Sequence, residues 1–295
     1  AFPLRAASIE LCAVDAHIGT VRKILMDAAC SRFDLVNNHS GIIASTDSDT
    51  VVDKRWLFHI MREMSNGADA VGGRIMTMGS LQDFMIYQQE NEIYRNLVAR
   101  VESIIDPQDH DPWPRHFQYY GANMAVKKSI YEAVGGIPAL RYLEDNALHD
   151  ALFRNDFKIR RSPDVIVTTS IRTEGRVEIG FSEQLKKWSC MYNSGIPQKV
   201  PSGLEVITLL NLRKRLRDCW LASKKNGIFN KEEVVSIAGD LMVDANWLSE
   251  EIDAAAYFGY LWLEADSRRA RGKWQHTFHA EPIQSATQYL EIFIG

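Results

Sequence analysis

Strand-type and helix-type segments alternate along the first 170 residues of this chain, and only helix-type segments follow from residue 204 onward. Runs of β-branched and apolar residues predict strands, and apolar residues at helical spacing predict helices. Strands are therefore expected at 7–15, 41–46, 68–75, 119–126 and 163–170, and helices at 20–30, 53–67, 80–105, 127–136 and 144–156. Because strands that alternate with helices form layered sheets, the sequence predicts an α/β fold followed by a helical C-terminal region.

The first two predicted helices each carry an apolar stripe that we expect to face the core. In the first helix the stripe comprises Val21, Ile24, Leu25, Ala28 and Ala29. In the second, which Asp53 can cap and Gly67 ends, it comprises Trp56, Leu57, Ile60, Met61 and Met64. These spacings follow the 3.6-residue period of an amphipathic helix.

Composition narrows the possible partners. The 295 residues are 46% hydrophobic, which is enough to bury one large core or two smaller ones. The formal net charge of -4 gives no electrostatic footprint for a polyanion, so we expect no nucleic-acid partner. The 4 cysteines are scattered without a CxxC pair and are expected to be buried thiols of a cytoplasmic protein. No apolar run approaches the ~20 residues of a membrane span, and no signal segment opens the chain.

Two aspartates, Asp47 and Asp49, stand one residue apart where the strand 41–46 ends. At about 6 Å and an effective dielectric constant of about 20, their carboxylates repel by about 3 kcal/mol. A hard divalent cation that shares a phosphate group of a ligand turns this repulsion into attraction. Ligands of open α/β sheets also gather at the carboxyl ends of strands. The alternative is that both aspartates are solvated turn residues, since Asp is common in turns.

Further motifs follow in a fixed order after this DSD tripeptide. They are RWL in the next helix, AVGGRI, YGANMAV with YEAVGG, LEDNALHDAL, and TTSIRTEGR. In this order and spacing, the chain resembles the GT-A glycosyltransferases of family 2 over about residues 17–190. The resemblance implies a GT-A fold, in which a mixed sheet is flanked by helices, within a catalytic domain over 1–200. Residues 201–295 are then a helical C-terminal extension.

The resemblance also implies a metal-assisted sugar transfer. Asp47 and Asp49 match the DxD motif, which holds Mg²⁺ or Mn²⁺ on the pyrophosphate of a UDP-, GDP- or dTDP-linked sugar. The second aspartate is usually the direct metal ligand. Asp145 of the Glu144–Asp145 pair matches the general base that accepts the proton of the acceptor hydroxyl, and transfer inverts the anomeric centre. The sugar and the acceptor are not specified by the sequence. The two acids can instead simply favour the positive N-terminal end of their helix.

Several secondary candidates each have a structural alternative. Arg172 and Arg176 can hold phosphate oxygens with their guanidinium groups, or be surface charges. Gly121 and Asn123 match the stretch that lines the acceptor side in the family, or belong to a buried strand. Trp188, in a near match to the QxxRW motif, is an acceptor platform or a packed helix residue.

Two sets of histidines complete the candidates. His149 lies one helical turn after the proposed base and can orient it or fill a metal position, or be a core-edge residue. His110, Trp113 and His116 belong to the Pro-rich segment 106–116, a loop of the kind that closes over substrates.

The sequence departs from the family pattern at its start. Family members begin with strands that carry an aspartate for the nucleotide base, and these elements are not found before residue 47. Together with the initial Ala, this predicts a domain that lacks its N-terminal strands. Two other hypotheses stay open: a metal-dependent nucleotidyltransferase on a related sheet, and a catalytically silent scaffold whose aromatic-rich helices at 232–265 bind a partner protein.

Overall fold

The computed structural model describes residues 5–78, 84–170 and 180–295. A five-stranded mixed sheet has the order β1-β4-β3-β5-β2, and a two-stranded sheet pairs β6 with β7. The strands are β1 (Ile42–Thr46), β2 (Thr50–Val52), β3 (Ala70–Met78), β4 (Asn123–Lys127), β5 (Ile159–Ser170), β6 (Lys199–Val200) and β7 (Glu281–Pro282). The helices are α1 (Ile18–Leu35), α2 (Trp56–Ser65), α3 (Met85–Ile105), α4 (Lys128–Ala133), α5 (Glu144–Arg154), α6 (Phe181–Asn193), α7 (Gly203–Asn226), α8 (Lys231–Leu241), α9 (Ala245–Ala254), α10 (Phe258–Arg271), α11 (Trp274–Thr277) and α12 (Ile283–Ile294).

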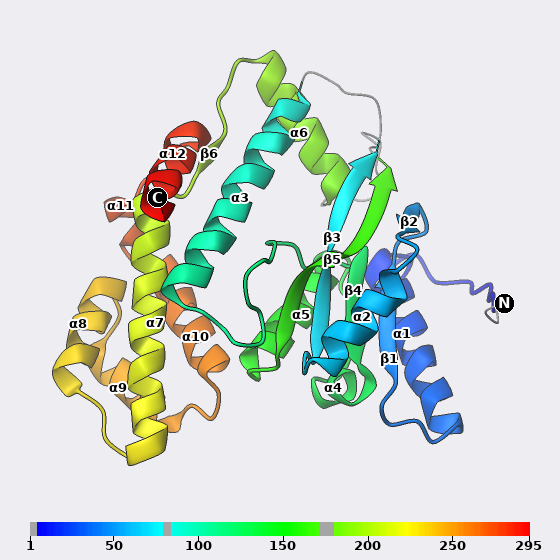
Figure 1. Ribbon diagram of the computed structural model, residues 1–295, viewed down its shortest axis with the longest axis horizontal. Coiled ribbons are helices and arrows are strands. Elements are labelled where there is room, and N and C mark those ends of the chain that lie inside the picture. The colour runs from blue at the N-terminus through cyan, green and yellow to red at the C-terminus, as the bar shows by residue number, and fades with distance from the viewer. Residues whose placement is uncertain (1–4, 79–83, 171–179) are drawn as a thin grey trace.

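Helices cover both faces of the larger sheet (Figure 1). On one face, α2 packs Trp56, Ile60 and Met64 against strand residues that include Val71. On the other face, α1, α4 and α5 pack against the neighbouring strand residues, Ala70 among them. Because successive strand residues point to opposite faces, one strand serves both cores. The expected mixed α/β fold, with helices around a mixed sheet, is confirmed.

The helical C-terminal region is also confirmed, and it has a core of its own. Helices α7 to α11 surround a buried cluster that includes Leu216, Ile237 and Phe258. A further cluster joins α3 to α7 and α12 through residues such as Val101 and Leu290. As Figure 1 shows, α3 lies between the sheet and the C-terminal helices. Within the described ranges, no helix combines the length and the hydropathy needed to cross a lipid bilayer.

Some local predictions were wrong. Residues 7–12 form no strand, and a turn occupies 13–15. In α1 only part of the predicted stripe faces the core: Ala29 packs against it, whereas Val21 and Leu25 are 42% and 65% exposed. The buried face instead carries Gly19, Arg22, Met26 and Cys30. Because this face includes the charged residue Arg22, apolar spacing alone does not identify it as the buried face.

The second helix and the cysteines also differ from expectation. Leu57 and Met61 are exposed although they lie on the predicted stripe of α2. Asp53 does not cap α2 as expected. Its carboxylate accepts a hydrogen bond from the backbone N–H of Arg55, which precedes the first helical residue, so Asp53 stabilises a turn before the helix. Of the free cysteines, Cys30 and Cys219 are buried, whereas Cys12 and Cys190 are exposed. The expectation that all are buried thiols was therefore wrong.

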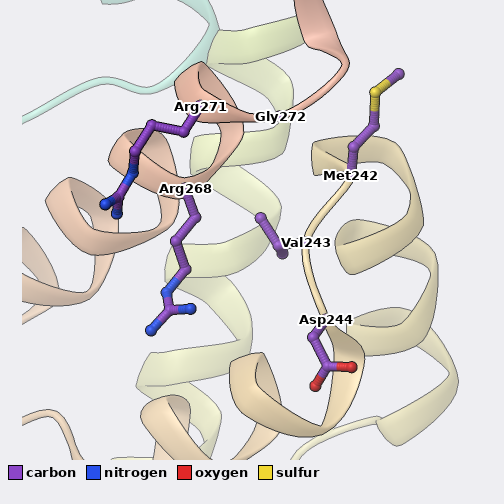
Figure 2. A pocket seen from close by; sticks show the side chains of 6 residues that line it. All are labelled: Met242, Val243, Asp244, Arg268, Arg271 and Gly272. Carbon is purple, nitrogen blue, oxygen red and sulfur yellow. The ribbon is translucent and has the colours of Figure 1, made fainter.

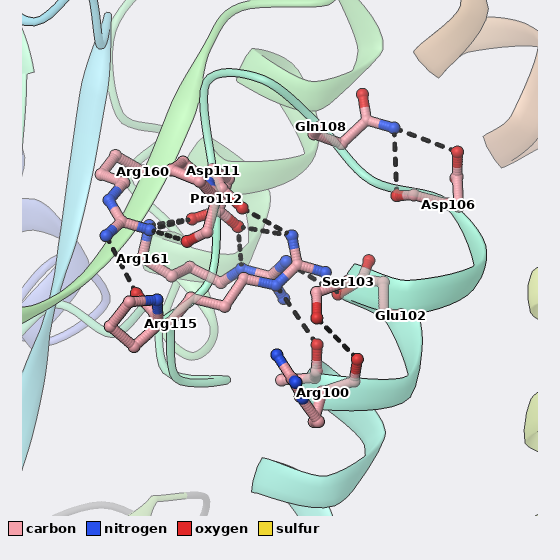
Figure 3. A network of polar contacts seen from close by, with 12 residues as sticks. Arg100, Glu102, Ser103, Asp106, Gln108, Asp111, Pro112, Arg115, Arg160 and Arg161 are labelled. Carbon is pink, nitrogen blue, oxygen red and sulfur yellow. Dashed lines mark hydrogen bonds and ion pairs between the residues drawn. The ribbon is translucent and has the colours of Figure 1, made fainter. Parts of the chain in front are cut away.

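The segment 106–116 is anchored by a buried ionic network (Figure 3). The carboxylate of Asp111, 3% exposed, lies 3.1 Å from Arg160, 2.8 Å from Arg161 and 3.2 Å from Arg115. Glu102 on α3 accepts from Arg161 at 2.7 Å, and continues the network towards α7. The loop is thus built into the packing between β5 and α3, an arrangement that does not favour movement over a substrate.

The imidazole of His116 is one of the groups that hold this loop. It is 4% exposed, its Nδ1 accepts a hydrogen bond from the Gln118 N–H, and its Nε2 lies 3.0 Å from the Ser162 carbonyl oxygen. With Nδ1 accepting, the neutral ring donates from Nε2. Burial lowers the pKa of His116 to about 4. Neither nitrogen is available to a substrate, so His116 is a structural residue.

This lowered pKa predicts a pH-dependent stability. The folded-state pKa of His116 lies below its unfolded value, so its contribution is complete above pH ~6.5 and is lost as the pH falls towards about 4. At pH 5 the loss amounts to about 2 kcal/mol. We expect urea unfolding at pH 7.5 and pH 5 to show this loss in the wild type and a smaller one in His116→Gln. Equal pH dependence in the two proteins would contradict the assignment.

Candidate active site

Several of the predicted site residues gather at one edge of the larger sheet. Strands β1 and β3 both run antiparallel to β4, and β3 runs parallel to β5, so β1, β3 and β5 end at the same edge. Asp47 and Asp49 follow β1, and Gly121 precedes β4 beside them, since Thr46 pairs with Asn123. This is the edge at which open α/β sheets bind ligands.

A buried arginine joins the two acidic motifs. Arg22 of α1 donates to Asp47 Oδ1 at 2.6 Å and forms a second ion pair with Glu144. The side chains of Arg22 and Glu144 are 7% and 4% exposed, whereas that of Asp47 is 39% exposed. The DSD turn and the start of α5, nearly 100 residues apart in sequence, therefore meet around one guanidinium. The sequence search missed Arg22. The sequence feature that could have identified Arg22 is its helical spacing from Gly19, Met26 and Cys30, which lie on the same buried face of α1.

Asp145 is held by backbone donors. Its Oδ2 accepts from the Gly121 N–H at 2.7 Å, and its Oδ1 accepts from the Asn146 N–H at 2.9 Å. Glu144 and Asp145 occupy the first turn of α5, directly after Leu143 in a left-handed conformation with φ of 60°. The positive end of the helix stabilises both acids, as the alternative interpretation holds.

Burial raises the pKa of Glu144, although the charge of Arg22 opposes this effect. The nearby carboxylates of Asp145 and Asp47 raise the pKa of Glu144 further, which places both aspartates within electrostatic reach of Glu144. The neighbouring Tyr119 is buried, and its hydroxyl has no hydrogen-bond partner among the described residues. Its pKa is raised by burial and then by the charge of Asp145. The acidic pair thus borders a poorly solvated wall.

Asp49 lies at the open side of the same edge. Its Oδ2 accepts from the hydroxyl of Ser170, at the end of β5, at 3.3 Å. Within the described part of the chain, no three His, Cys, Asp or Glu side chains form a ready metal cage. By residue type, a pair of carboxylates is a donor set of the kind that Mg²⁺ takes in phosphate sites, where phosphate and water oxygens complete its shell. The donor set is therefore suitable only for a metal that arrives with a phosphate ligand.

The contacts of two other candidates, Asn123 and Trp188, favour their structural alternatives. Asn123 is 0% exposed, and its side chain donates to the carbonyls of Arg74 and Val165 and accepts from the indole of Trp56. Trp188 is 6% exposed within a cluster that includes Phe84, Met85 and Leu185. An acceptor could reach neither side chain in this conformation.

His149 packs its ring 5.1 Å from that of Tyr119 and stacks on Phe153, and its Nδ1 lies 3.4 Å from Asp150 Oδ1. These contacts are those of a core-edge histidine. Arg172 and Arg176 lie outside the described residues, so their predicted phosphate contacts stay predictions.

A cavity of about 450 Å³ lies elsewhere, between helices of the C-terminal region (Figure 2). It is lined by Met242, Val243, Asp244, Arg268, Arg271 and Gly272. The guanidinium of Arg268 stacks over the ring of Trp247 at 4.0 Å. The side chain of Asp244 caps the N-terminus of α9. None of the predicted site residues lines this cavity. The cavity is therefore distinct from the acidic site at the edge of the sheet.

Comparisons with known proteins give little beyond this geometry. No family model matches the chain, and no curated protein matches it. Among solved structures, it is similar to the mannosyltransferase PcManGT from Pyrobaculum calidifontis in complex with GDP-Man and Mn²⁺, at 12% sequence identity and a TM-score of 0.32. The match covers 89% of this chain and 64% of that protein. A TM-score this low does not establish a common fold.

Proposed function

We propose that this chain is an inverting glycosyltransferase that moves a sugar from a nucleotide-sugar donor to an acceptor hydroxyl with the help of a divalent metal. One observation carries the proposal: Asp47 of the DSD turn and the Glu144–Asp145 pair meet at the carboxyl edge of a single sheet. A DSD turn that only served solvation would not need to meet a second acidic motif. The order of motifs between about residues 17 and 190 gives independent support.

Asp145 is the proposed general base. Two backbone N–H groups fix its carboxylate, so an acceptor hydroxyl would meet an oriented proton acceptor. Orientation of this kind supplies much of the advantage of a positioned base. Gly121, whose N–H holds Asp145, would border the acceptor. Glu144 is buried against Arg22 and is proposed to support the base rather than to replace it.

Asp49 and Asp47 are the proposed holders of Mg²⁺ or Mn²⁺ on the donor pyrophosphate, with Arg172 and Arg176 as further phosphate contacts. When bound, the metal neutralises the charge that grows on the leaving phosphate oxygen. The donor is a UDP-, GDP- or dTDP-linked sugar. In this proposal residues 1–200 carry catalysis and residues 201–295 form a helical extension. The separated cysteines suit a cytoplasmic setting.

Isothermal titration against UDP-, GDP- and dTDP-sugars with Mn²⁺ tests this proposal. We expect one nucleotide class to bind at least about 10-fold more tightly than the others, a difference of about 1.4 kcal/mol. Binding and sugar-nucleotide turnover should both be lost when EDTA is added, because the two aspartates would then repel each other and the pyrophosphate. Full turnover in EDTA would reject the metal role. Tighter binding of nucleoside triphosphates than of any sugar nucleotide would favour a nucleotidyltransferase.

A further inference from the structure

Arg22 is the cation at the centre of the candidate site, and the fold is shaped to hold it there. It projects from the first turns of α1, where Gly19 lets the helix approach the segment before α5. A Cβ at Gly19 would lie 1.9 Å from the carbonyl oxygen of Leu140. This close backbone contact fixes α1 against the chain that leads into Glu144. The guanidinium therefore reaches the acidic pair from a docked helix and not from a mobile surface position.

Gly121 provides the space for this guanidinium. A Cβ at that position would lie 2.2 Å from Arg22 Nη1, closer than side-chain atoms approach. The same residue donates its N–H to Asp145. Gly121 therefore contacts both residues: its Cα leaves the space that the Arg22 guanidinium fills, and its N–H binds the Asp145 carboxylate.

The charges explain why Arg22 has to be present. Glu144 is 3% exposed, and a buried carboxylate without a partner is strongly destabilised. Asp47 adds a second negative charge on the other arm of the guanidinium. The fork of an arginine can hold two carboxylates in a fixed plane, which the point charge of a lysine cannot. Removal of Arg22 would free the first turn of α5 from the DSD turn, in which Asp49 keeps its own hydrogen bond from Ser170.

We propose that Arg22 is a positioning residue that fixes the Glu144–Asp145 turn relative to the DSD turn, and that Asp47 serves mainly to hold Arg22. This role rests on the proposed transferase function. Arg22 acts through Glu144 and Asp47, and it sets the distance between the base and the donor. The sugar donor itself is bound by other groups.

Two variants remove this positioning by different routes. Arg22→Met deletes the charge, and Gly121→Ala displaces the guanidinium while leaving Arg22 in the chain. Arg22→Lys restores a charge without the two-armed geometry. Arg32→Met, at an exposed position in the last turn of the same helix, is the matched control. Hydrogen exchange measured by mass spectrometry reports the order of 119–123 and 143–149 without any substrate. Donor titration and steady-state kinetics report function.

We expect hydrogen exchange in 119–123 and 143–149 to rise about 10-fold in Arg22→Met and Gly121→Ala, and to stay unchanged in Arg32→Met. Because a displacement of about 1 Å can cost ~10²-fold in rate, kcat should fall by about that factor while donor affinity changes little. Arg22→Lys should recover part of kcat. Unchanged exchange in both variants would overturn the proposal. So would a loss of donor affinity as large as the loss of kcat in Arg22→Met, since Arg22 would then bind the donor.

The proposed function can fail separately. If the wild type neither binds nor turns over any sugar nucleotide, the transferase assignment is rejected. Faster exchange in 119–123 and 143–149 would still show that Arg22 positions the acidic pair, and unchanged exchange would reject that role as well.

Discussion

Replacement of Asp145 by asparagine is expected to lower the rate of sugar transfer by about 10²–10⁴-fold, the range that a positioned general base contributes. An amide cannot accept the proton of the acceptor hydroxyl at neutral pH. Its oxygen can still accept the hydrogen bond that the Gly121 N–H now gives to Asp145 Oδ2. The substitution therefore removes proton acceptance and keeps the bond from Gly121, while the bond from the Asn146 N–H is lost because the amide nitrogen takes the place of Oδ1.

The measurement is kcat at saturating donor, together with the donor affinity obtained by titration. Donor affinity should stay within about threefold, or ~0.7 kcal/mol, of the wild type, because the phosphates are assigned to other residues. Asp150→Asn is a matched control on the same helix, since the side chain of Asp150 is 62% exposed. It should leave both quantities unchanged. If Asp145→Asn keeps full turnover, Asp145 is not the base.

The parts of the fold that the sequence predicted are those set by local patterns. Most strands and helices were found because alternation and helical spacing act over a few residues. The DSD turn was placed at a sheet edge because it directly follows an apolar run. The failed strand at 7–15 shows the limit, since strand-type residues there have no neighbouring strand to pair with in the structure. Strand formation depends on such tertiary partners more than helix formation does.

The parts that the sequence did not predict depend on contacts between distant residues. Arg22 looked like one of many charged helix residues, and only the fold brings it to Glu144. Asn123 and Trp188 matched functional motifs, yet hydrogen bonds to distant carbonyls and packing against α3 occupy them. Motif spacing identifies residue types and cannot show whether a side chain is already occupied. The acids of the site were found because they are adjacent in sequence.

The network around Asp111 was hidden for the same reason, and it gives the largest expected effect on stability. Replacement of Asp111 by asparagine should lower the free energy of unfolding by about 3–5 kcal/mol, the cost of removing one partner from a buried ion pair. Three arginines converge on this carboxylate, which also accepts the backbone N–H of Arg161. Burial raises the pKa of Asp111, but the charges of Arg161 and Arg115 and the hydrogen bonds from Arg161 lower it by more. Without the carboxylate, the guanidinium groups repel one another in a poorly solvated place.

Urea unfolding of the wild type and of Asp111→Asn at pH 7 measures this cost. The matched control is Asp164→Asn, which breaks the ion pair between Asp164 and Arg62. This pair is shorter, at 2.6 Å, but the side chain of Asp164 is 51% exposed. Because exposed pairs contribute little, the control should lose less than about 1 kcal/mol. Distance alone would predict the opposite order for the two substitutions. A loss in Asp111→Asn no greater than in Asp164→Asn would mean that water reaches the network, and that the segment 106–116 is not anchored by it.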